Sequence, residues 1–360
     1  MSRLADWQNG LDASLEALAE AERAAFGSLP GHRPFRRLGR WIVAEAAFSE
    51  LRRDDGVLHG AFRGAPWALA AVRLRMAPRV MLPSAAAALL LKSNLRAFYP
   101  DRRATLKIAD PRRSRAAARL RNEALNRRGL ADTVHVTVPR LLQKADPAHD
   151  GFLLEEMVQG RPLQRDELPP ARLAAQLIEF HRANGLRVED AGAVFAFDES
   201  WRILHEYLQQ QNIEIGHGPV ERVTALIARG RQGPLPIATA VTNNDLTISN
   251  LLSTGRKIAI IDWEYAGLAP AFVDAVRLST QIEGYAAAFA TEFEAQMAAE
   301  TPAMLPAADQ FLLSVLAVCR QRIARRGDFE TDGERTGYEA RLRRRMLDFV
   351  ALSERLASRG

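Results

Sequence analysis

Cysteine is nearly absent from the chain: among 360 residues only Cys319 occurs, within the apolar run FLLSVLAVCRQR. A single cysteine excludes an internal disulfide, so we expect a core side chain and a protein of the reducing cytoplasm. The N-terminal residues lack the uninterrupted apolar core of a signal peptide. The longest apolar run, residues 85–91, is far shorter than the roughly 20 residues that span a membrane.

Several familiar site patterns are missing as well. The sequence has no zinc-ligand spacing, no phosphate-binding P-loop, no nucleophile elbow and no internal repeat. The arginine-rich residues 341–345 have few aromatic neighbours, so we expect a solvated helix face there and no nucleic-acid partner. The net charge of +6 is uneven, because residues 1–128 hold 24 basic and 12 acidic side chains. The excess positive charge of residues 1–128 has two possible interpretations. It attracts an anionic partner, or it consists of ordinary solvated arginines.

Three oxygen-bearing side chains occupy particular places in residues 241–264, VTNNDLTISNLLSTGRKIAIIDWE. Asp245 lies in a loop, Asn250 precedes a predicted hairpin, and Asp262 ends the second strand of that hairpin. Because a hairpin folds back on itself, Asn250 and Asp262 can approach one another, with Asp245 facing them. Carboxylate and amide oxygens suit Mg²⁺ bound to nucleotide phosphates, so the set indicates phosphoryl transfer. The alternative is that all three are ordinary turn residues.

These motifs are similar to those of a known family. Asp-x₄-Asn followed by Ile-Asp-Trp-Glu resembles the catalytic loop and metal motif of the aminoglycoside phosphotransferase/choline kinase family, relatives of the protein kinases. The resemblance implies that Asp245 is catalytic, that Asn250 and Asp262 bind Mg²⁺, and that Glu264 assists the metal site.

A further family element and one departure from the pattern accompany the motifs. The element Gly-x-x-Pro-x-x-x-Asp matches Gly267, Pro270 and Asp274. The sequence departs from the family pattern at two adjacent positions, where Asn243 replaces a histidine and Asn244 replaces a glycine. That histidine mainly supports the loop, and Asn243 can still hydrogen-bond the backbone, so we expect weaker support and retained chemistry.

A lysine and a glutamate are the candidates for holding nucleotide phosphates. Lys107 alternates with Leu106 and Ile108 in a predicted strand, so it points to the opposite face from them. Glu123 is the only acidic residue between positions 111 and 130, which predicts a Lys107–Glu123 ion pair that positions the lysine as in kinases. The alternative is an exposed lysine and a Glu123 paired with arginines of its own helix.

Short strands are predicted at residues 89–92, 95–99, 103–109, 134–142 and 151–158. No glycine-rich phosphate loop accompanies them, since only residues 92–94 (KSN) stand at the first hairpin. The segment after the last strand resembles the connector between the lobes of the family. This resemblance implies that backbone groups of Glu156, Met157 and Val158 contact an adenine.

Residues 2–27, 36–53 and 66–76 are predicted as helices of an N-terminal extension. This extension either packs on the small lobe or contacts a membrane or protein partner through the basic residues 33–40. Further helices are predicted at residues 170–184, where His181 is expected to pack, and at residues 271–298, 307–326 and 334–358.

Together these observations predict an α+β, bilobal, protein-kinase-like fold. A helical N-terminal extension (1–84) precedes a small β-rich nucleotide-binding lobe (85–158) and a mainly helical catalytic and substrate lobe (159–360). We predict an ATP- and Mg²⁺-dependent phosphotransferase that acts on a small-molecule hydroxyl of a sugar, glycan unit or amino alcohol. A pseudokinase-type nucleotide-binding scaffold is the alternative, and a membrane or nucleic-acid adaptor rests on charge asymmetry alone. The oligomeric state has no signature in the sequence.

Overall fold

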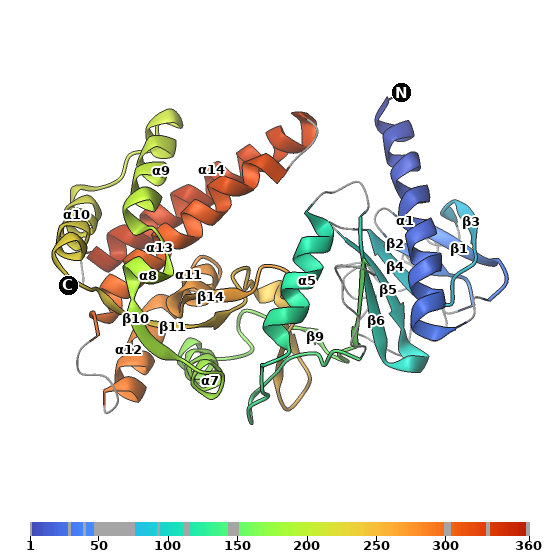
Figure 1. Cartoon of the computed structure of the whole chain (residues 1–360), viewed down its shortest axis with the longest axis horizontal. Coiled ribbons are helices and arrows are strands. Elements are labelled where there is room, and N and C mark those ends of the chain that lie inside the picture. The colour runs from blue at the N-terminus through green and yellow to red at the C-terminus, as the bar shows by residue number, and fades with distance from the viewer. Residues whose placement is uncertain are drawn as a thin grey trace. The chain divides into compact units, whose positions relative to one another are not determined.

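The computed structural model describes residues 2–27, 30–38, 41–46, 76–91, 94–110, 115–142, 151–298, 304–328 and 332–357 (Figure 1). Its internal contacts divide the chain into two compact units. The sheet unit comprises Met1–Leu130, Thr137–Leu163 and Leu251–Glu264. The helical unit comprises Ala131–Val136, Gln164–Asn250 and Tyr265–Gly360.

Within the described residues of the sheet unit, the main element is a seven-stranded antiparallel sheet of order β3-β1-β2-β4-β5-β6-β8. Its strands are β1 (Arg33–Leu38), β2 (Trp41–Ala44), β3 (Arg79–Leu82), β4 (Ala88–Leu91), β5 (Asn94–Tyr99), β6 (Ala104–Ala109) and β8 (Phe152–Glu156), with the short 3-10 helix η1 (Pro100–Arg102) between β5 and β6. The strands predicted at residues 89–92, 95–99, 103–109 and 151–158 are therefore confirmed within one to two residues.

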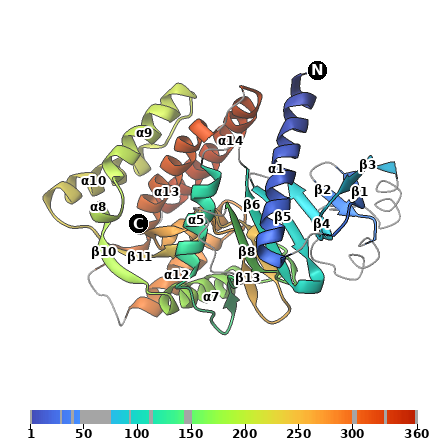
Figure 2. The same cartoon turned by 45° about the vertical axis from the view of Figure 1, so that its right-hand side comes forward.

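Two helices cover opposite faces of β6. Leu106 and Ile108 belong to the apolar core that also contains Leu18 of α1 (Ser2–Phe26). Lys107 lies between them in sequence and contacts Glu123 of α5 (Ala116–Arg127) instead. Because successive side chains of a strand alternate between its faces, α1 and α5 lie on different sides of the strand (Figure 2).

The helical extension predicted for residues 1–84 is only partly correct. Residues 2–27 do form α1, but the helix predicted at residues 36–53 is wrong, since β1 and β2 occupy much of it. The boundary predicted after residue 84 falls inside one sheet, because β2 pairs with β4 through Trp41 and Leu90. Pairing buries Ile42 and Val43 completely, and this tertiary burial outweighs the helical spacing of apolar residues. The helix predicted at residues 66–76 lies almost wholly outside the described residues.

The basic residues of this segment make internal contacts. Arg33 donates to the carbonyl oxygens of Ser84 and Ala86 at 3.0 Å each. Arg36 forms an ion pair with Glu45 at 2.5 Å. These contacts favour the interpretation that the segment packs within the sheet unit.

The predicted catalytic hairpin is present. It consists of β12 (Leu251–Ser253) and β13 (Ile258–Ile260), which pair with Leu251 opposite Ile260. Gly255 at the turn has φ 84°, a backbone conformation that glycine adopts without strain. The hairpin belongs to a four-stranded sheet of order β7-β13-β12-β9, with β7 (Val136–Thr137) and β9 (Arg161–Pro162). Only two residues of the strand predicted at 134–142 are therefore in β7.

The helical unit is built around a small sheet of order β10-β11-β14, with β10 (Arg187–Asp190), β11 (Pro236–Thr242) and β14 (Gly267–Pro270). Its helices are α7 (Pro170–Ala183), α8 (Ala191–Val194), α9 (Phe197–Gln210), α10 (His217–Gln232), α11 (Phe272–Ser279), α12 (Tyr285–Met297), α13 (Ala307–Ala324) and α14 (Asp332–Ala357), with the 3-10 helices η2 (Ile248–Asn250) and η3 (Arg325–Asp328).

Aromatic packing and one glycine organise the C-terminal helices. Phe272 contacts the rings of Phe289, Phe293 and Phe311, with centroids 4.6–5.1 Å apart. The single helix predicted at residues 271–298 is two helices, because Gly284 adopts φ 73° before α12. Cys319 is completely buried, as predicted.

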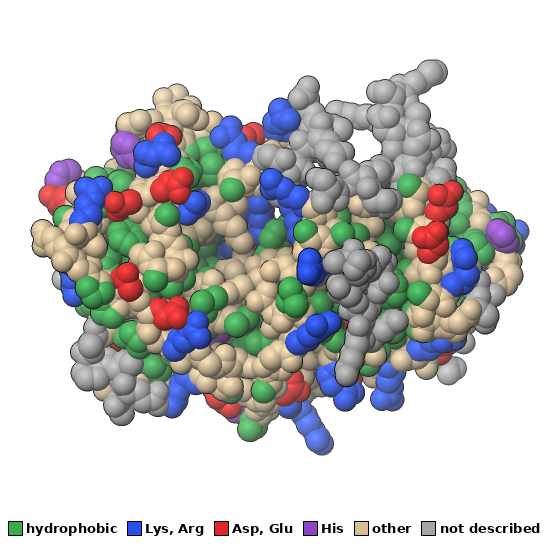
Figure 3. All heavy atoms as spheres, viewed as in Figure 1, with side chains coloured by type: hydrophobic (Ala, Val, Ile, Leu, Met, Phe, Trp, Pro, Cys, Tyr) green, Lys and Arg blue, Asp and Glu red, His purple; other side chains and the backbone are tan. Residues whose placement is uncertain are grey.

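Within the described residues, acidic and basic side chains are interspersed on the face shown in Figure 3. Among these residues, no helix combines the length and the apolar character that crossing a membrane requires.

His181 is expected to make folding stability depend on pH. It is 2% exposed in α7, and burial lowers its pKa to about 4. Because this folded-state pKa lies below the unfolded value, the neutral ring stabilises the fold above about pH 6.5, and that contribution is lost as pH falls towards 4. Between about pH 7.5 and pH 5, the wild type should lose roughly 2 kcal/mol more free energy of unfolding than His181→Leu. Urea denaturation of both proteins measures this, and parallel pH dependences would refute it.

Candidate active site

The loop that carries Asp245 is held by a buried carboxylate. Asp274 in α11 accepts hydrogen bonds from the backbone N–H groups of Asn243 at 2.9 Å and Asn244 at 3.0 Å. The side chain of Asp274 is 3% exposed, and burial raises its pKa to about 6. Asn244 has φ 59°, a conformation that asparagine tolerates better than most residues. Asp274, the aspartate of the Gly-x-x-Pro-x-x-x-Asp element, therefore fixes the backbone of the loop just before Asp245.

Two amide side chains complete the loop. Oδ1 of Asn243 accepts the backbone N–H of Asp245 at 3.2 Å, which is the backbone support expected from the residue at the histidine position. Nδ2 of Asn250 donates to the carbonyl oxygen of Asp245 at 3.0 Å. This bond commits the nitrogen end of the Asn250 amide to the loop, so its oxygen faces elsewhere and suits a cation.

Arginines surround the carboxylate of Asp245. Its Oδ1 lies 2.6 Å from Nη2 of Arg322 and 3.2 Å from Nη2 of Arg277, and its Oδ2 lies 3.2 Å from Nη1 of Arg325. The three guanidinium side chains are 3–10% exposed, whereas the Asp245 side chain is 24% exposed. The sequence did not predict these contacts. A usable signal existed for Arg277, which stands between the apolar residues Val276 and Leu278 of a predicted helix.

In the sheet unit, Lys107 forms the predicted ion pair. Its Nζ lies 2.6 Å from Glu123 and 3.2 Å from Glu155. Arg127 contacts the same two carboxylates, so two buried cations neutralise two buried anions. Burial acts to lower the pKa of Lys107, but the two carboxylates outweigh it and the pKa is raised. The alternative is wrong for the lysine, which is buried, but correct for Glu123, which also pairs with Arg127 of its own helix. The contact with Glu155 was not predicted.

The carboxylates of the Ile-Asp-Trp-Glu motif also have polar partners from β5. Oδ1 of Asp262 lies 2.7 Å from Nη2 of Arg96. Glu264 accepts a hydrogen bond from Asn94 at 3.0 Å. Burial, and then the charge of Asp262, raises the pKa of Glu264 to about 7. Asp262 itself has φ 67°, a conformation that costs energy outside glycine and is common at functional sites.

The chemistry of these donors fits a magnesium ion. In the sheet unit, Asp262 and Glu264 offer carboxylate oxygens, which are hard ligands that Mg²⁺ prefers. In the helical unit, Asn250 offers an amide oxygen of the same kind. Burial raises the pKa of Glu264 and the charge of Asp262 raises it further, and a bound cation would oppose both effects. In the part of the chain that the structure describes, no group of three histidine, cysteine or acidic side chains forms a complete metal cage.

The connector residues differ in what their backbones offer. The N–H of Glu156 donates to the carbonyl of Arg140, and the N–H of Met157 donates to the carbonyl of Arg103, both at 2.8 Å. These two amides are thus used within the chain. The N–H of Val158 remains the candidate donor for a base.

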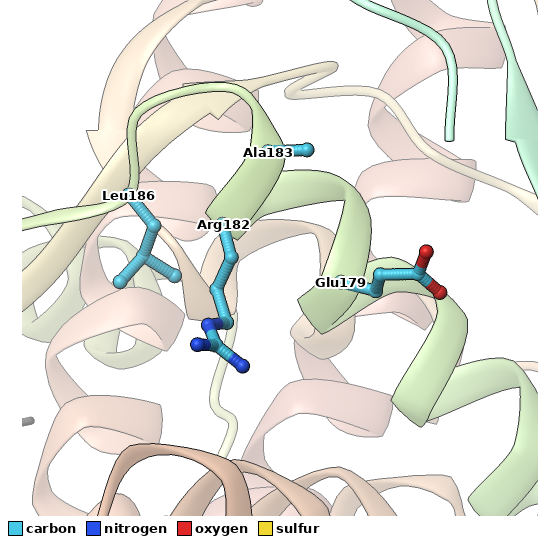
Figure 4. A pocket seen from close by; sticks show the side chains of 4 residues that line it. All are labelled: Glu179, Arg182, Ala183 and Leu186. Atoms are coloured by element: carbon cyan, nitrogen blue, oxygen red, sulfur yellow. The ribbon is translucent and has the colours of Figure 1, made fainter. Parts of the chain in front are cut away.

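The predicted residues are distributed over both units. Lys107, Glu123, Asp262 and Glu264 lie in the sheet unit, where Arg96 connects electrostatically with both acidic motif residues. Asp245 and Asn250 lie in the helical unit and contact one another. Elsewhere in that unit, a pocket of about 370 Å³ is lined by Glu179, Arg182, Ala183 and Leu186 and contains none of these residues (Figure 4).

A sheet unit with a buried lysine–glutamate pair and a helical unit with an aspartate loop define a protein-kinase-like phosphotransferase. The model of the phosphotransferase enzyme family APH matches residues 93–311, so the chain belongs to this family. It is therefore an enzyme of the kinase type, in a family that phosphorylates hydroxyl groups of small molecules. None of the curated proteins compared with the chain matches it.

Solved structures of the same fold are similar to the chain at low identity. The GDP complex of aminoglycoside 2'-phosphotransferase-IIIa is 17% identical over 74% of this chain and 88% of its own, with a TM-score of 0.43. A choline/ethanolamine kinase family protein from Mesorhizobium loti is 20% identical over 76% and 92%, with a TM-score of 0.40. Macrolide 2'-phosphotransferase MphH from Brachybacterium faecium is 19% identical over 69% and 88%, with a TM-score of 0.44.

The buried network predicts that Lys107 is needed for folding stability. In Lys107→Met, Arg127 is the one cation among the described residues that still forms ion pairs with Glu123 and Glu155, and a buried carboxylate without a partner costs about 3 kcal/mol or more. We expect the free energy of unfolding to fall by that amount in urea denaturation. The double variant Lys107→Met/Glu155→Gln should recover part of the loss, since it removes one anion along with the cation. No recovery would show that the network does not act as a charge-balanced unit.

Proposed function

We propose that the enzyme transfers the γ-phosphoryl group of ATP, with Mg²⁺, to a hydroxyl of a small molecule. The observation that carries the proposal is the Asp245 loop, in which Asp274 and Asn243 accept the backbone N–H groups of residues 243–245 and so fix a partly exposed carboxylate. A rigidly placed carboxylate can orient a hydroxyl and accept its proton. The conclusion is an alcohol-accepting kinase, as the family implies.

The roles of the other residues follow from their chemistry. In the transfer, the bond from the γ-phosphorus to the β–γ bridging oxygen breaks, the acceptor oxygen bonds to phosphorus, and the hydroxyl proton passes to Asp245. Asn250 and Asp262 would hold Mg²⁺, which neutralises phosphate charge when bound, and Glu264 would assist them. Lys107, fixed by Glu123, would bind the α- and β-phosphates, and the connector Glu156–Met157–Val158 would contact the base.

The acceptor proposed first is a sugar or glycan unit, followed by an amino alcohol. The solved structures with a similar fold are described as aminoglycoside, macrolide and choline enzymes, and all of these compounds carry hydroxyl groups. The test is therefore a panel of hydroxyl compounds rather than one substrate.

Replacement of Asp245 should abolish transfer while the fold survives. With Mg²⁺ and ATP, one class of acceptor should stimulate ADP release, and Asp245→Asn should lower that rate about 100-fold or more, because a positioned base contributes this much. Asp198→Asn serves as the matched control, since Asp198 also pairs with an arginine, Arg231, but on an exposed surface. Equal rates for Asp245→Asn and the wild type would refute the proposed role.

A nucleotide-binding scaffold is the second candidate function. The observation that favours it is that Asp245 and Asp262 are both paired with arginines, which compete with a hydroxyl and a metal. For a scaffold, Mg·ATP should raise the melting temperature while no acceptor stimulates ADP release. ADP release that depends on Asp245 would exclude it.

A further inference from the structure

The cluster of Arg277, Arg322 and Arg325 around Asp245 holds more positive than negative charge. Three guanidinium groups contact a single carboxylate. The next acidic neighbour, Asp274, has a pKa raised to about 6 by burial, and its oxygens accept backbone N–H groups. In the helical unit, the charge of Arg345 in α14 also acts on Arg277 and opposes its ionisation. Because Asp274 with this pKa is still mostly ionised at neutral pH, three arginines face two carboxylates, and the cluster lacks about one negative charge.

The three arginines differ in how fully they are bonded. Nη2 of Arg277 also contacts the carbonyl of Asn244 at 2.5 Å and the amide oxygen of Gln321 at 3.2 Å, so Arg277 helps to build the loop. Arg322 gives Nη2 to Asp245. Arg325 gives only Nη1. Among the described residues, the buried Nε of Arg277 and of Arg322 each lack a hydrogen-bond partner, whereas Arg325 has two such donors, Nε and Nη2. A buried donor without a partner is costly and uncommon, so Arg325 is the side chain that a ligand would satisfy.

Arg325 is also held in a defined orientation. Its guanidinium carbon lies 3.4 Å from the centroid of the Tyr265 ring, in a cation–π contact. Arg325 is the first residue of η3, directly after α13, and its side chain is 10% exposed. A guanidinium whose plane is fixed by an aromatic ring is prepared for two parallel hydrogen bonds to a phosphate or a carboxylate.

We propose that the acceptor of this phosphotransferase carries an anionic oxygen group, a phosphate or a carboxylate, in addition to the hydroxyl, and that Arg325 binds that group. The inference rests on the proposed function and specifies its substrate class. Arg325 is the side chain bonded to Oδ2 of Asp245, whereas Arg277 and Arg322 are bonded to Oδ1. An anion that takes over Arg325 therefore leaves Oδ1 anchored and releases Oδ2 for the acceptor hydroxyl. The same exchange supplies a negative charge to the cluster.

The test measures binding of anions to the full chain without nucleotide. The probes are inorganic phosphate, a hexose 6-phosphate, a hexuronic acid and a neutral hexose, titrated into the wild type by calorimetry. We expect an anionic probe to bind at least 10-fold more tightly than the neutral hexose. Arg325→Gln should weaken that probe about 10- to 100-fold, since hydrogen bonds between charged groups are worth this much. The comparison of hexose phosphate with hexuronic acid identifies which anion the site prefers.

Two further variants make the test specific. Arg320→Gln is the matched control, because Arg320 lies on α13 five residues earlier and pairs with Glu199 at 37% exposure. It should bind the anions as the wild type does. Arg325→Lys keeps the charge but loses the planar fork, so it should bind with an intermediate affinity and also controls for misfolding of the glutamine variant. Anions that bind no more tightly than neutral hexose, or equal losses in Arg320→Gln and Arg325→Gln, would overturn the proposal.

ADP release, measured in parallel, distinguishes a failure of this inference from a failure of the proposed kinase reaction. If Mg·ATP is neither consumed nor stabilising with any probe, the proposed kinase reaction is wrong, whatever the anions do. If a neutral hydroxyl compound is phosphorylated at a rate that Arg325→Gln leaves unchanged, the reaction is right and the anionic acceptor is wrong. Stimulation by an anionic probe, with KM raised at least 10-fold in Arg325→Gln, supports both.

Discussion

The pairing of buried charge is the constraint on which both units of this enzyme depend. A carboxylate or a guanidinium without a partner is strongly disfavoured inside a protein, so each must be matched where it lies. In the sheet unit, Lys107 and Arg127 match Glu123 and Glu155. In the helical unit, the Asp274 carboxylate is matched by two backbone N–H groups instead of a cation. The geometry of the candidate site follows from these pairings.

Where the charges of the protein are not balanced, the excess charge indicates the sign of the charge that a ligand would carry. Burial and the charge of Asp262 raise the pKa of Glu264, an effect that a cation would offset. The arginines near Asp245 outnumber the carboxylates, which suits an anion. In a phosphoryl transfer to a hydroxyl compound with an anionic group, Mg²⁺ would supply the cation and the acceptor would supply the anion. The two imbalances lie in different units, so the anion test in the helical unit does not require the metal.

Prediction from the sequence succeeded where a few residues determine local structure. Three predictions are confirmed: the strand around Lys107, the ion pair inferred from the isolated Glu123, and the turn at Gly255. Each was inferred from neighbouring residues in the sequence. It failed for residues 36–44, because apolar residues at mixed spacing fit a helix as well as a strand. The roles of Asp245, Asn250 and Asp262 stay predictions.

The sequence by itself determined the family and the residue types available for chemistry, since Asp-x₄-Asn and Ile-Asp-Trp-Glu are contiguous motifs. Only the tertiary structure decided which charges share a partner. Arg96 reaches Asp262 across 166 positions, and Arg322 and Arg325 reach Asp245 across 77 and 80. Nothing local distinguishes these arginines from the others of an arginine-rich chain. Their selection depends on strand register and helix packing, which long-range burial establishes.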